Sequence, residues 1–121
     1  DPGDKTPEDT ALRETEEEVG LNHRHVKIIG HLNEYVTRTG FSITPVVGLV
    51  TPPFDVTPDP HEVDEIFEVP LDFLLDPANH QRHRKEFKGI MREFHAMHYG
   101  DYYIWGATAG MLFNLYEVLQ K

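Results

Sequence analysis

The sequence predicts an α+β domain, and the order of its segments carries that prediction. A helical segment comes first, several short extended segments separated by turns follow, and an apolar helix ends the sequence. Helices on either side of such a run of strands cover a mostly antiparallel or mixed sheet. The length of 121 residues suits one domain over 1–121 and leaves little room for a second.

Two helices are predicted at the ends of the sequence, over 6–19 and 107–120. Thr6 suits the N-cap of the first helix, Pro7 suits its first position, and Gly20 suits its C-terminal stop. Helical periodicity gives each helix one apolar face that can cover a sheet. The face of the first helix consists of Ala11, Leu12, Thr15 and Val19. The face of the last helix consists of Met111, Leu112, Leu115, Val118 and Leu119.

The first strands are predicted between these helices. Residues 25–30 and 32–38 are rich in β-branched and aromatic side chains, which favours extended structure. Thr39 and Gly40 suit a hairpin turn, after which 41–50 returns as another strand.

The second half of the sequence predicts shorter elements separated by loops. Four prolines make 51–60 a loop, 65–69 is predicted as a short strand, and 70–75 as the start of a short helix. The segment 83–99 fits either a helix or two strands. We favour two strands, because Gly89 interrupts the segment and aromatic residues alternate with polar ones around it.

The composition excludes several classes of function. No apolar run approaches the ~20 residues that a membrane helix needs, so no membrane partner is expected. The absence of cysteine excludes disulfides and cysteine nucleophiles, and is compatible with the cytoplasmic location that we expect. A formal charge of −10 opposes nucleic-acid binding. A small anionic substrate would need a local cation, and a metal ion is the obvious source.

The stretch RETEEEVGL, residues 13–21, concentrates acidic side chains on the first helix. On a helical wheel Glu14, Glu17 and Glu18 fall within an arc of roughly 100° beside the apolar face, whereas Glu16 lies apart. Like charges at this spacing repel, and a bound divalent cation would turn the repulsion into attraction. The alternative is an ordinary solvated acidic face, which the spacing alone does not exclude.

The eight histidines do not predict a zinc site. No pair has the helical i, i+4 spacing together with a third ligand that a zinc hydrolase needs. We interpret them as surface or loop residues.

Residues 13–21 resemble the second half of the Nudix box: Arg-Glu, an apolar residue, any residue, Glu-Glu, any residue, Gly, and an apolar residue. Thr15 departs mildly from the pattern, and its methyl group can still pack. The earlier acidic position is best matched by Asp4, with eight residues between it and Arg13. This long spacing is similar to that of the coenzyme A pyrophosphatase branch of the family. Further stretches that resemble this branch are 40–50, 61–76 and 103–112.

The resemblance implies a Nudix-type α/β/α sandwich with a mixed β-sheet. The strands ahead of the box, its double glycine and an upstream motif associated with coenzyme A binding do not occur in these 121 residues. We therefore expect a Nudix domain that lacks its N-terminal portion and is not competent alone. The missing strands would come from a complementing N-terminal segment or from edge pairing in a homodimer.

The resemblance also implies an activity. The expected reaction is metal-dependent hydrolysis of coenzyme A or its derivatives to 3′,5′-ADP and 4′-phosphopantetheine, with Mg²⁺ or Mn²⁺ as cofactor. One alternative substrate class is ADP-ribose or a dinucleoside polyphosphate. Another alternative is a binding module of the same fold without catalysis, against which the intact Glu14, Glu17 and Glu18 argue.

The resemblance assigns roles to residues of the helix. Glu14 and Glu18 are the first choices as metal ligands, followed by Glu17, which is also a candidate catalytic residue. Arg13 would pair with Asp4 and brace the loop between them. A plain intrahelical surface pair is the alternative role for Arg13.

A downstream acid commonly completes such a site as ligand or base. The candidates are Glu62 and Glu65, in the stretch HEVDE that follows the proline-rich loop. We favour Glu62, because Glu65 begins the predicted short strand and its side chain can point elsewhere. An ordinary acidic loop is the alternative for either residue.

Overall fold

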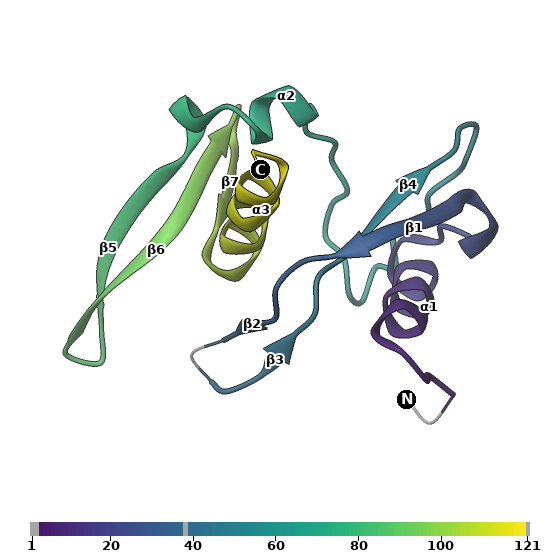
Figure 1. Cartoon of the computed structure of the whole chain (residues 1–121), viewed down its shortest axis with the longest axis horizontal. Coiled ribbons are helices and arrows are strands. Elements are labelled where there is room, and N and C mark those ends of the chain that lie inside the picture. Colours follow the sequence, from purple (N-terminus) through teal and green to yellow (C-terminus); the bar gives the residue numbers. More distant parts are fainter. Residues whose placement is uncertain (1–2, 38, 121) are drawn as a thin grey trace. The chain divides into compact units, whose positions relative to one another are not determined.

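The computed structural model describes residues 3–37 and 39–120 and divides into two compact units (Figure 1). The first unit comprises Asp1–His31 and Thr44–Glu68, and the second comprises Leu32–Ile43 and Val69–Lys121. Helices and antiparallel strands occur in both units, which confirms the predicted α+β class. None of the helices in the described ranges is long and apolar enough to cross a membrane.

In the first unit, the helix α1 (Pro7–Val19) begins and ends as predicted. The Thr6 side chain accepts a hydrogen bond from the backbone N–H of Asp9 at 3.1 Å, which satisfies one of the free donors at the helix start. Gly20 ends the helix in the left-handed conformation, with φ of 72°. A short 3₁₀ turn, η1 (His23–His25), then leads into the first strand.

The predicted apolar face of α1 covers a two-stranded antiparallel sheet. Its strands are β1 (Val26–His31) and β4 (Val46–Val50), with Val26 opposite Val50. The register shifts between Ile28 and Gly30. A small apolar space separates the helix from the sheet. It is lined by Ala11, Leu12, Thr15, Leu21, Val26, Ile28, Val46, Gly48 and Val50.

The second unit begins with a hairpin of β2 (Tyr35–Val36) and β3 (Ser42–Ile43). It continues through the short helix α2 (Leu71–Leu74) and the 3₁₀ turn η2 (Pro77–Asn79). Three antiparallel strands in the order β5-β6-β7 then form the larger sheet, and α3 (Gly106–Leu119) follows. The strand bounds are β5 Gln81–Phe87, β6 Ile90–Tyr99 and β7 Tyr102–Trp105.

The core of the second unit lies between this sheet and the helices. Met97, Ile104 and Ala109 are buried there, and Phe73 and Leu112 pack against them. The predicted apolar face of the last helix is only partly correct. Its C-terminal members, Val118 and Leu119, are 42% and 52% exposed, because the helix buries its N-terminal half instead.

Three predictions about strands differ from the structure. The strand predicted at 65–69 is absent, and those residues have no regular structure. Pro70 lacks the N–H that would extend a ladder there. The strand predicted at 41–50 is split into β3 and β4 around Pro45, for the same reason. Within 32–37 the strand predicted at 32–38 is reduced to β2, and Arg38 lies outside the described residues.

Two other predictions are confirmed. The segment 83–99 forms the β5–β6 hairpin, with positive φ at Lys88 and Gly89, which excludes the helical alternative. Loop structure over 51–60 is also present. The strand pairs in the described ranges are all antiparallel and belong to three small sheets, whereas the resemblance implied a mixed sheet. Parallel pairs need long crossover connections, and here each ladder closes around a turn or a hairpin.

Candidate functional site

An acidic hollow of about 430 Å³ lies in the first unit. Five carboxylates line it, three from α1 and two from the loop that follows β4, and no basic side chain does. They are Glu14, Glu17, Glu18, Asp59 and Glu62. The three glutamates that the helical wheel grouped therefore share one surface. Glu16 lines a different hollow with Arg13 and His23, as its separate position on the wheel predicted.

Backbone hydrogen bonds attach the loop to the end of α1. The N–H of Thr57 donates to the carbonyl oxygen of Val19 at 2.7 Å, and the N–H of Asp59 donates to that of Glu18 at 2.8 Å. The last carbonyls of a helix have no partner within the helix, so the loop satisfies groups that would otherwise need water. This attachment brings the loop carboxylates beside those of the helix.

Asp59 then organises the turn that carries Glu62. Its carbonyl oxygen accepts from the N–H of Glu62 at 3.1 Å and of Val63 at 2.8 Å. Its side-chain Oδ1 accepts from the N–H of His61 at 2.9 Å. Short aspartate side chains commonly fix turns in this way. Glu62 is therefore held by a defined turn.

Gly20 permits the close approach of helix and loop. Its φ of 72° is costly for residues with a side chain. A Cβ at this position would also lie 3.0 Å from the nitrogen and 3.1 Å from the oxygen of Thr57. These are backbone atoms, so a side chain here would displace the loop.

Arg13 pairs with Asp4, as predicted. Its Nε lies 2.9 Å and its Nη2 2.8 Å from Oδ2 of Asp4, and the Thr10 hydroxyl donates to the same oxygen at 3.1 Å. The intrahelical alternative is present as well, because Nη1 of Arg13 donates to Oε2 of Glu17 at 2.9 Å. Arg13 thus joins the segment before the helix to one of the hollow's carboxylates.

The charge pair changes the acidity of both partners. The hydrogen bond from Arg13 lowers the pKa of Asp4 below its usual value of 3.8, and it raises the pKa of Arg13 above its usual range. The Asp4 side chain is only 11% exposed. Asp4 is therefore a structural anion held ionised by Arg13 at neutral pH.

The other carboxylates are available to a cation. Within the described ranges, the side chains of Glu14, Glu18 and Glu62 form no hydrogen bond or ion pair with the protein. Oxygen donors of this type suit hard divalent cations, and Mg²⁺ typically keeps several waters and binds one or two carboxylates. The donor set therefore fits a hard divalent cation.

The carboxylates are not arranged as a closed cage. Among residues 3–37 and 39–120, no three His, Cys, Asp or Glu side chains converge closely enough to hold an ion as they stand. Glutamate side chains at the surface of a helix can rotate toward a cation at small cost, so the hollow collects donors without fixing their final geometry.

The sequence prediction included Glu62 and missed Asp59. Glu65, the other candidate downstream acid, does not line the hollow. The strand that was predicted to begin at Glu65 is absent, so the reason given for favouring Glu62 over Glu65 was wrong. The spacing could have identified Asp59. It lies three residues before Glu62, so one turn of the chain brings both side chains to the hollow.

Several histidines lie on strands or make defined contacts, whereas surface or loop positions were predicted for all of them. His83, His95 and His98 lie on strands of the second unit, and His95 stacks on Phe113 with ring centres 4.5 Å apart. The Nε2 of His80 lies 2.7 Å from the carbonyl oxygen of Leu74. No zinc cluster occurs in the described part of the chain.

Comparison with known proteins gives the family. The model of the NUDIX domain matches residues 1–94. A protein of Photorhabdus laumondii, called uncharacterized Nudix hydrolase NudL, is 36% identical over 99% of this chain and 64% of its own length. The peroxisomal coenzyme A diphosphatase NUDT7 of Mus musculus is 40% identical over 84% of this chain and 43% of its own.

A plant protein is similar over nearly the whole chain. The mitochondrial Nudix hydrolase 15 of Arabidopsis thaliana is 33% identical over 97% of this chain and 45% of its own length. The chain thus spans between 43% and 64% of the length of these relatives. The family match covers RETEEEVGL, the helix that carries it and the loop that completes the acidic hollow. The chain belongs to the NUDIX domain family.

Proposed function

We propose that this chain carries the metal-binding helix and the catalytic loop of a hydrolase that cleaves a phosphoric anhydride bond in a nucleoside diphosphate derivative. The observation that carries the proposal is the acidic hollow. Carboxylates from α1 and from the loop after β4 line one cavity, and three of them have no partner in the described residues. Such a surface repels a diphosphate unless cations bind first.

Glu14, Glu17 and Glu18 would hold Mg²⁺ or Mn²⁺. Bound there, the metal would neutralise diphosphate oxygens and lower the pKa of a bound water. Arg13 contributes indirectly, because it holds the carboxylate of Glu17 at the edge of the hollow and ties the segment around Asp4 to the helix. Arg13 is thus a positioning residue in this proposal.

Glu62 would act as the general base. It would take a proton from the attacking water, whose oxygen bonds to phosphorus while the bridging P–O bond breaks and leaves a second phosphate. Glu17 is the other candidate base. Glu62 is favoured because its carboxylate has no partner in the described residues, whereas that of Glu17 accepts a hydrogen bond from Arg13.

The proposed substrate is coenzyme A or one of its derivatives, cleaved to 3′,5′-ADP and 4′-phosphopantetheine. Two observations support it: the long spacing between Asp4 and Arg13, and the similarity to a mouse protein named as a coenzyme A diphosphatase. ADP-ribose and dinucleoside polyphosphates are the alternative substrates. A binding module without turnover is the alternative function.

Direct comparison of substrates tests the proposal. The intact protein is incubated with coenzyme A, ADP-ribose or a dinucleoside tetraphosphate, with Mg²⁺ or Mn²⁺, and the products are separated by chromatography. We expect 3′,5′-ADP from coenzyme A at the highest kcat/KM. If another substrate is cleaved at a higher kcat/KM, that substrate would take the place of coenzyme A in the proposal. If none of the three substrates is cleaved with either metal, although the circular dichroism spectrum of the protein is native, the result would favour the binding module.

We also propose that the β1–β4 sheet pairs with a further strand, from a second copy of the chain or from a segment N-terminal to it. This sheet has two strands, so each has an outer edge without a strand partner in the described residues. Ile29 and Leu49 on these strands are 54% and 56% exposed. Exposed apolar edges favour strand addition. Light scattering across a range of concentrations separates a dimer from a monomer.

A further inference from the structure

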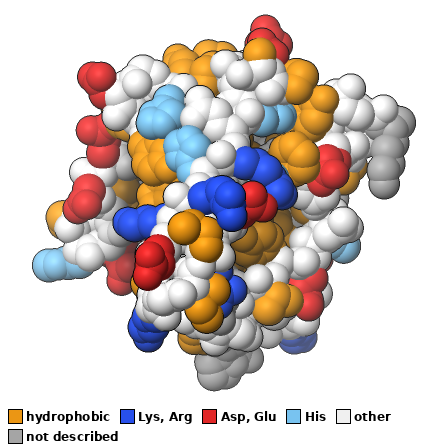
Figure 2. All heavy atoms as spheres, turned by 90° about the vertical axis from the view of Figure 1, so that its left-hand side faces the viewer, with side chains coloured by type: hydrophobic (Ala, Val, Ile, Leu, Met, Phe, Trp, Pro, Cys, Tyr) orange, Lys and Arg blue, Asp and Glu red, His pale blue; other side chains and the backbone are white. Residues whose placement is uncertain are grey.

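The sheet β5-β6-β7 has one face toward α3 and one face away from it. Side chains alternate between the two faces of a strand. On β6, His95 stacks on a ring of α3 and Met97 is buried in the core, so both face the helix. Phe94, Ala96 and His98 therefore lie on the opposite face, called the outer face below. Figure 2 views the molecule from the side that carries β5 and β6, and it shows histidine side chains beside hydrophobic ones.

His83 and Tyr103 contact each other on the outer face, across the middle strand. His83 on β5 pairs with Phe94, and Tyr103 on β7 pairs with His98. Ala96 lies between these two positions of β6, and its small side chain leaves room for the two rings above it. Ala96 is only 1% exposed, as expected beneath such rings. The Nδ1 of His83 lies 2.7 Å from the hydroxyl oxygen of Tyr103, and the angle between the ring planes is 18°.

Gln81 determines which nitrogen of His83 carries a hydrogen. The two residues are next but one on β5, so their side chains share the outer face. The side-chain oxygen Oε1 of Gln81 lies 2.8 Å from Nε2 of His83. An amide oxygen can only accept, so Nε2 is the donor, and in the neutral ring Nδ1 is left with a lone pair. The hydroxyl of Tyr103 therefore donates to Nδ1, and Gln81 fixes the ring in the orientation that this bond needs.

This order of groups is that of an activated nucleophile. A protonated hydroxyl is a weak nucleophile, and it is activated by a base within hydrogen-bond reach that a third group orients. Tyr103, His83 and Gln81 supply the hydroxyl, the base and the orienting group. We propose that Tyr103 is an activated nucleophile and that its oxygen is a site of covalent modification by activated acyl donors. The site lies in the second unit, so it does not depend on the acidic hollow of the first unit or on the hydrolase proposed there.

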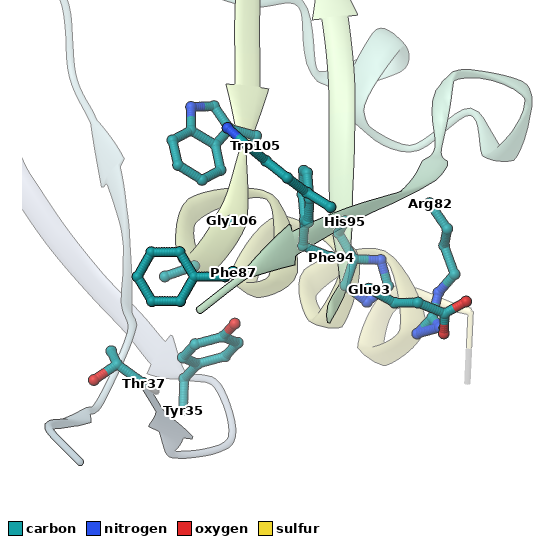
Figure 3. Close-up of a pocket in the computed structure, with 11 residues that line it drawn as sticks. Tyr35, Thr37, Arg82, Phe87, Glu93, Phe94, His95, Trp105 and Gly106 are labelled. Atoms are coloured by element: carbon teal, nitrogen blue, oxygen red, sulfur yellow. The ribbon is translucent and has the colours of Figure 1, made fainter. Parts of the chain in front are cut away.

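The surroundings of Tyr103 give an acyl donor access and a surface to pack on. Tyr103 is 41% exposed, and Trp105, two residues further along β7, is 58% exposed. Their rings are parallel to within 15°, with centres 6.3 Å apart. Phe94 packs edge-to-face against Trp105 at 5.8 Å and holds the indole in position (Figure 3). An uncharged donor with a planar leaving group would stack on these rings while its carbonyl carbon lies beside the phenol oxygen.

The proposed reaction is an acyl transfer. The oxygen of Tyr103 bonds to the carbonyl carbon of the donor while its proton passes to Nδ1 of His83. The bond between that carbon and the leaving group breaks, and the leaving group takes the electron pair. His83 then gives the proton to the leaving group and returns to its neutral state. The products are an O-acyl tyrosine and the leaving group with one added hydrogen.

N-acetylimidazole is the probe for this reaction, because it is an activated acyl donor with a planar leaving group. The full chain is incubated with it at neutral pH, and acetylation of each tyrosine is followed over time by mass spectrometry of peptides. The other tyrosines are the internal references: Tyr35, Tyr99, Tyr102 and Tyr116. We expect Tyr103 to be acetylated about tenfold faster, or more, than any of them. Tyr103→Phe should abolish this fast label and leave the references unchanged.

Two histidines separate activation from exposure, which alone would also favour Tyr103. The ring of His98 lies 4.6 Å from that of Tyr103, but the hydrogen bond comes from His83. Substitution by Phe keeps an aromatic ring beside Tyr103 in both cases. We expect His83→Phe to slow acetylation of Tyr103 about tenfold or more, a conservative share of the ~10²–10⁴ that a positioned base contributes. His98→Phe should change the rate less than about twofold. The rates of the reference tyrosines and the circular dichroism spectrum verify that both variants are folded.

Variants of Gln81 test its role as a positioning residue. Gln81→Leu removes the acceptor that selects the tautomer of His83, so it should slow acetylation of Tyr103. Gln81→Glu keeps an acceptor oxygen and should react at the wild-type rate or faster. If the two variants slow the reaction equally, the oxygen of Gln81 does not orient the ring, which contradicts the proposed arrangement.

Three further results would overturn the proposal. One is an unchanged rate at Tyr103 in His83→Phe, and another is equal slowing by His83→Phe and His98→Phe. The third is a reference tyrosine that is acetylated as fast as Tyr103 in the wild-type protein.

Discussion

The backbone N–H of Asp59 donates to the carbonyl oxygen of Glu18 at 2.8 Å, and this bond joins the two halves of the acidic hollow. Glu18 also contributes its own side chain to the hollow, so the same residue supplies both a carboxylate and the anchor for the opposite wall. The geometry of the site therefore depends on how closely the loop can approach the end of α1.

Gly20→Ala should damage the site without touching a carboxylate. The new Cβ would meet backbone atoms of Thr57 at 3.0 Å and force the loop away from the helix. Gly100→Ala is the control, because Gly100 also has positive φ but a Cβ there has nothing within 4 Å. The shared conformational cost is about 1–2 kcal/mol.

The measurements are urea unfolding and metal-dependent turnover. The backbone strain should cost both variants a similar amount of stability. Gly20→Ala should lose more than Gly100→Ala, because its Cβ also displaces the loop. Only Gly20→Ala should also lower kcat by more than tenfold. Equal turnover in the two variants would show that the loop does not need this approach.

Glu14→Gln and Glu18→Gln should each lower kcat by about 10²–10³ with the fold retained. Each substitution removes a charged oxygen donor from the hollow and keeps the size of the side chain. Glu16→Gln is the matched control, since it lies on the same helix and outside the hollow. If the three variants have the same kcat at saturating Mg²⁺, the metal ligands lie elsewhere.

Divalent metal should stabilise the fold. The clustered carboxylates repel one another without a cation, and a ligand that binds only the native state adds about 2.7 kcal/mol at a hundredfold excess over its Kd. Thermal melting with 0 and millimolar Mg²⁺ or Mn²⁺ measures this gain. The Glu14→Gln, Glu18→Gln double variant should show little shift and Glu16→Gln a full one. An unchanged melting temperature in the wild-type protein would argue against a formed site.

Local signals were enough to predict α1 and its acidic flank. Thr6, Pro7 and Gly20 act within one or two turns of the helix, so the caps and the faces follow from nearest neighbours in sequence. The pairing of Arg13 with Asp4 needed the family pattern, because nothing local selects Asp4 over other acidic residues. That pairing is present in the structure.

Features that depend on distant parts of the chain were not predicted. The place of Asp59 is set by bonds to the carbonyls that end α1, and no local pattern encodes that contact. The absent strand at 65–69 has an extended composition but no partner strand in the described residues. Likewise, the outward position of Val118 and Leu119 depends on where α3 meets the sheet, which periodicity does not determine.

Asp4→Asn should make the free energy of unfolding less dependent on pH in the acidic range. Arg13 lowers the pKa of Asp4 in the folded protein below 3.8, so the ionised pair contributes stability above that pH. The contribution is lost as the pH falls through the folded pKa. Asp4→Asn should therefore destabilise the protein at pH 7, and the difference from wild type should shrink below about pH 4.

Denaturant midpoints between pH 2 and pH 7 test this prediction. Asp101→Asn, in the exposed turn between β6 and β7, controls for the loss of one negative charge. A difference between wild type and Asp4→Asn that is constant across this pH range would mean that the charge of Asp4 does not matter to the fold.

Glu62→Gln should lower kcat more than it changes metal affinity, because the proposed role of this residue is to take a proton from water. Glu65→Gln is the matched control: it is three residues away, exposed and outside the hollow. We expect a loss of about 10²–10⁴ in kcat for Glu62→Gln and less than twofold for Glu65→Gln. A general base also gives the rate an acidic limb, so the wild-type rate should fall as the pH drops and this limb should disappear in Glu62→Gln. If the limb remains and only the metal requirement rises, Glu62 is a ligand, and Glu17 becomes the candidate base.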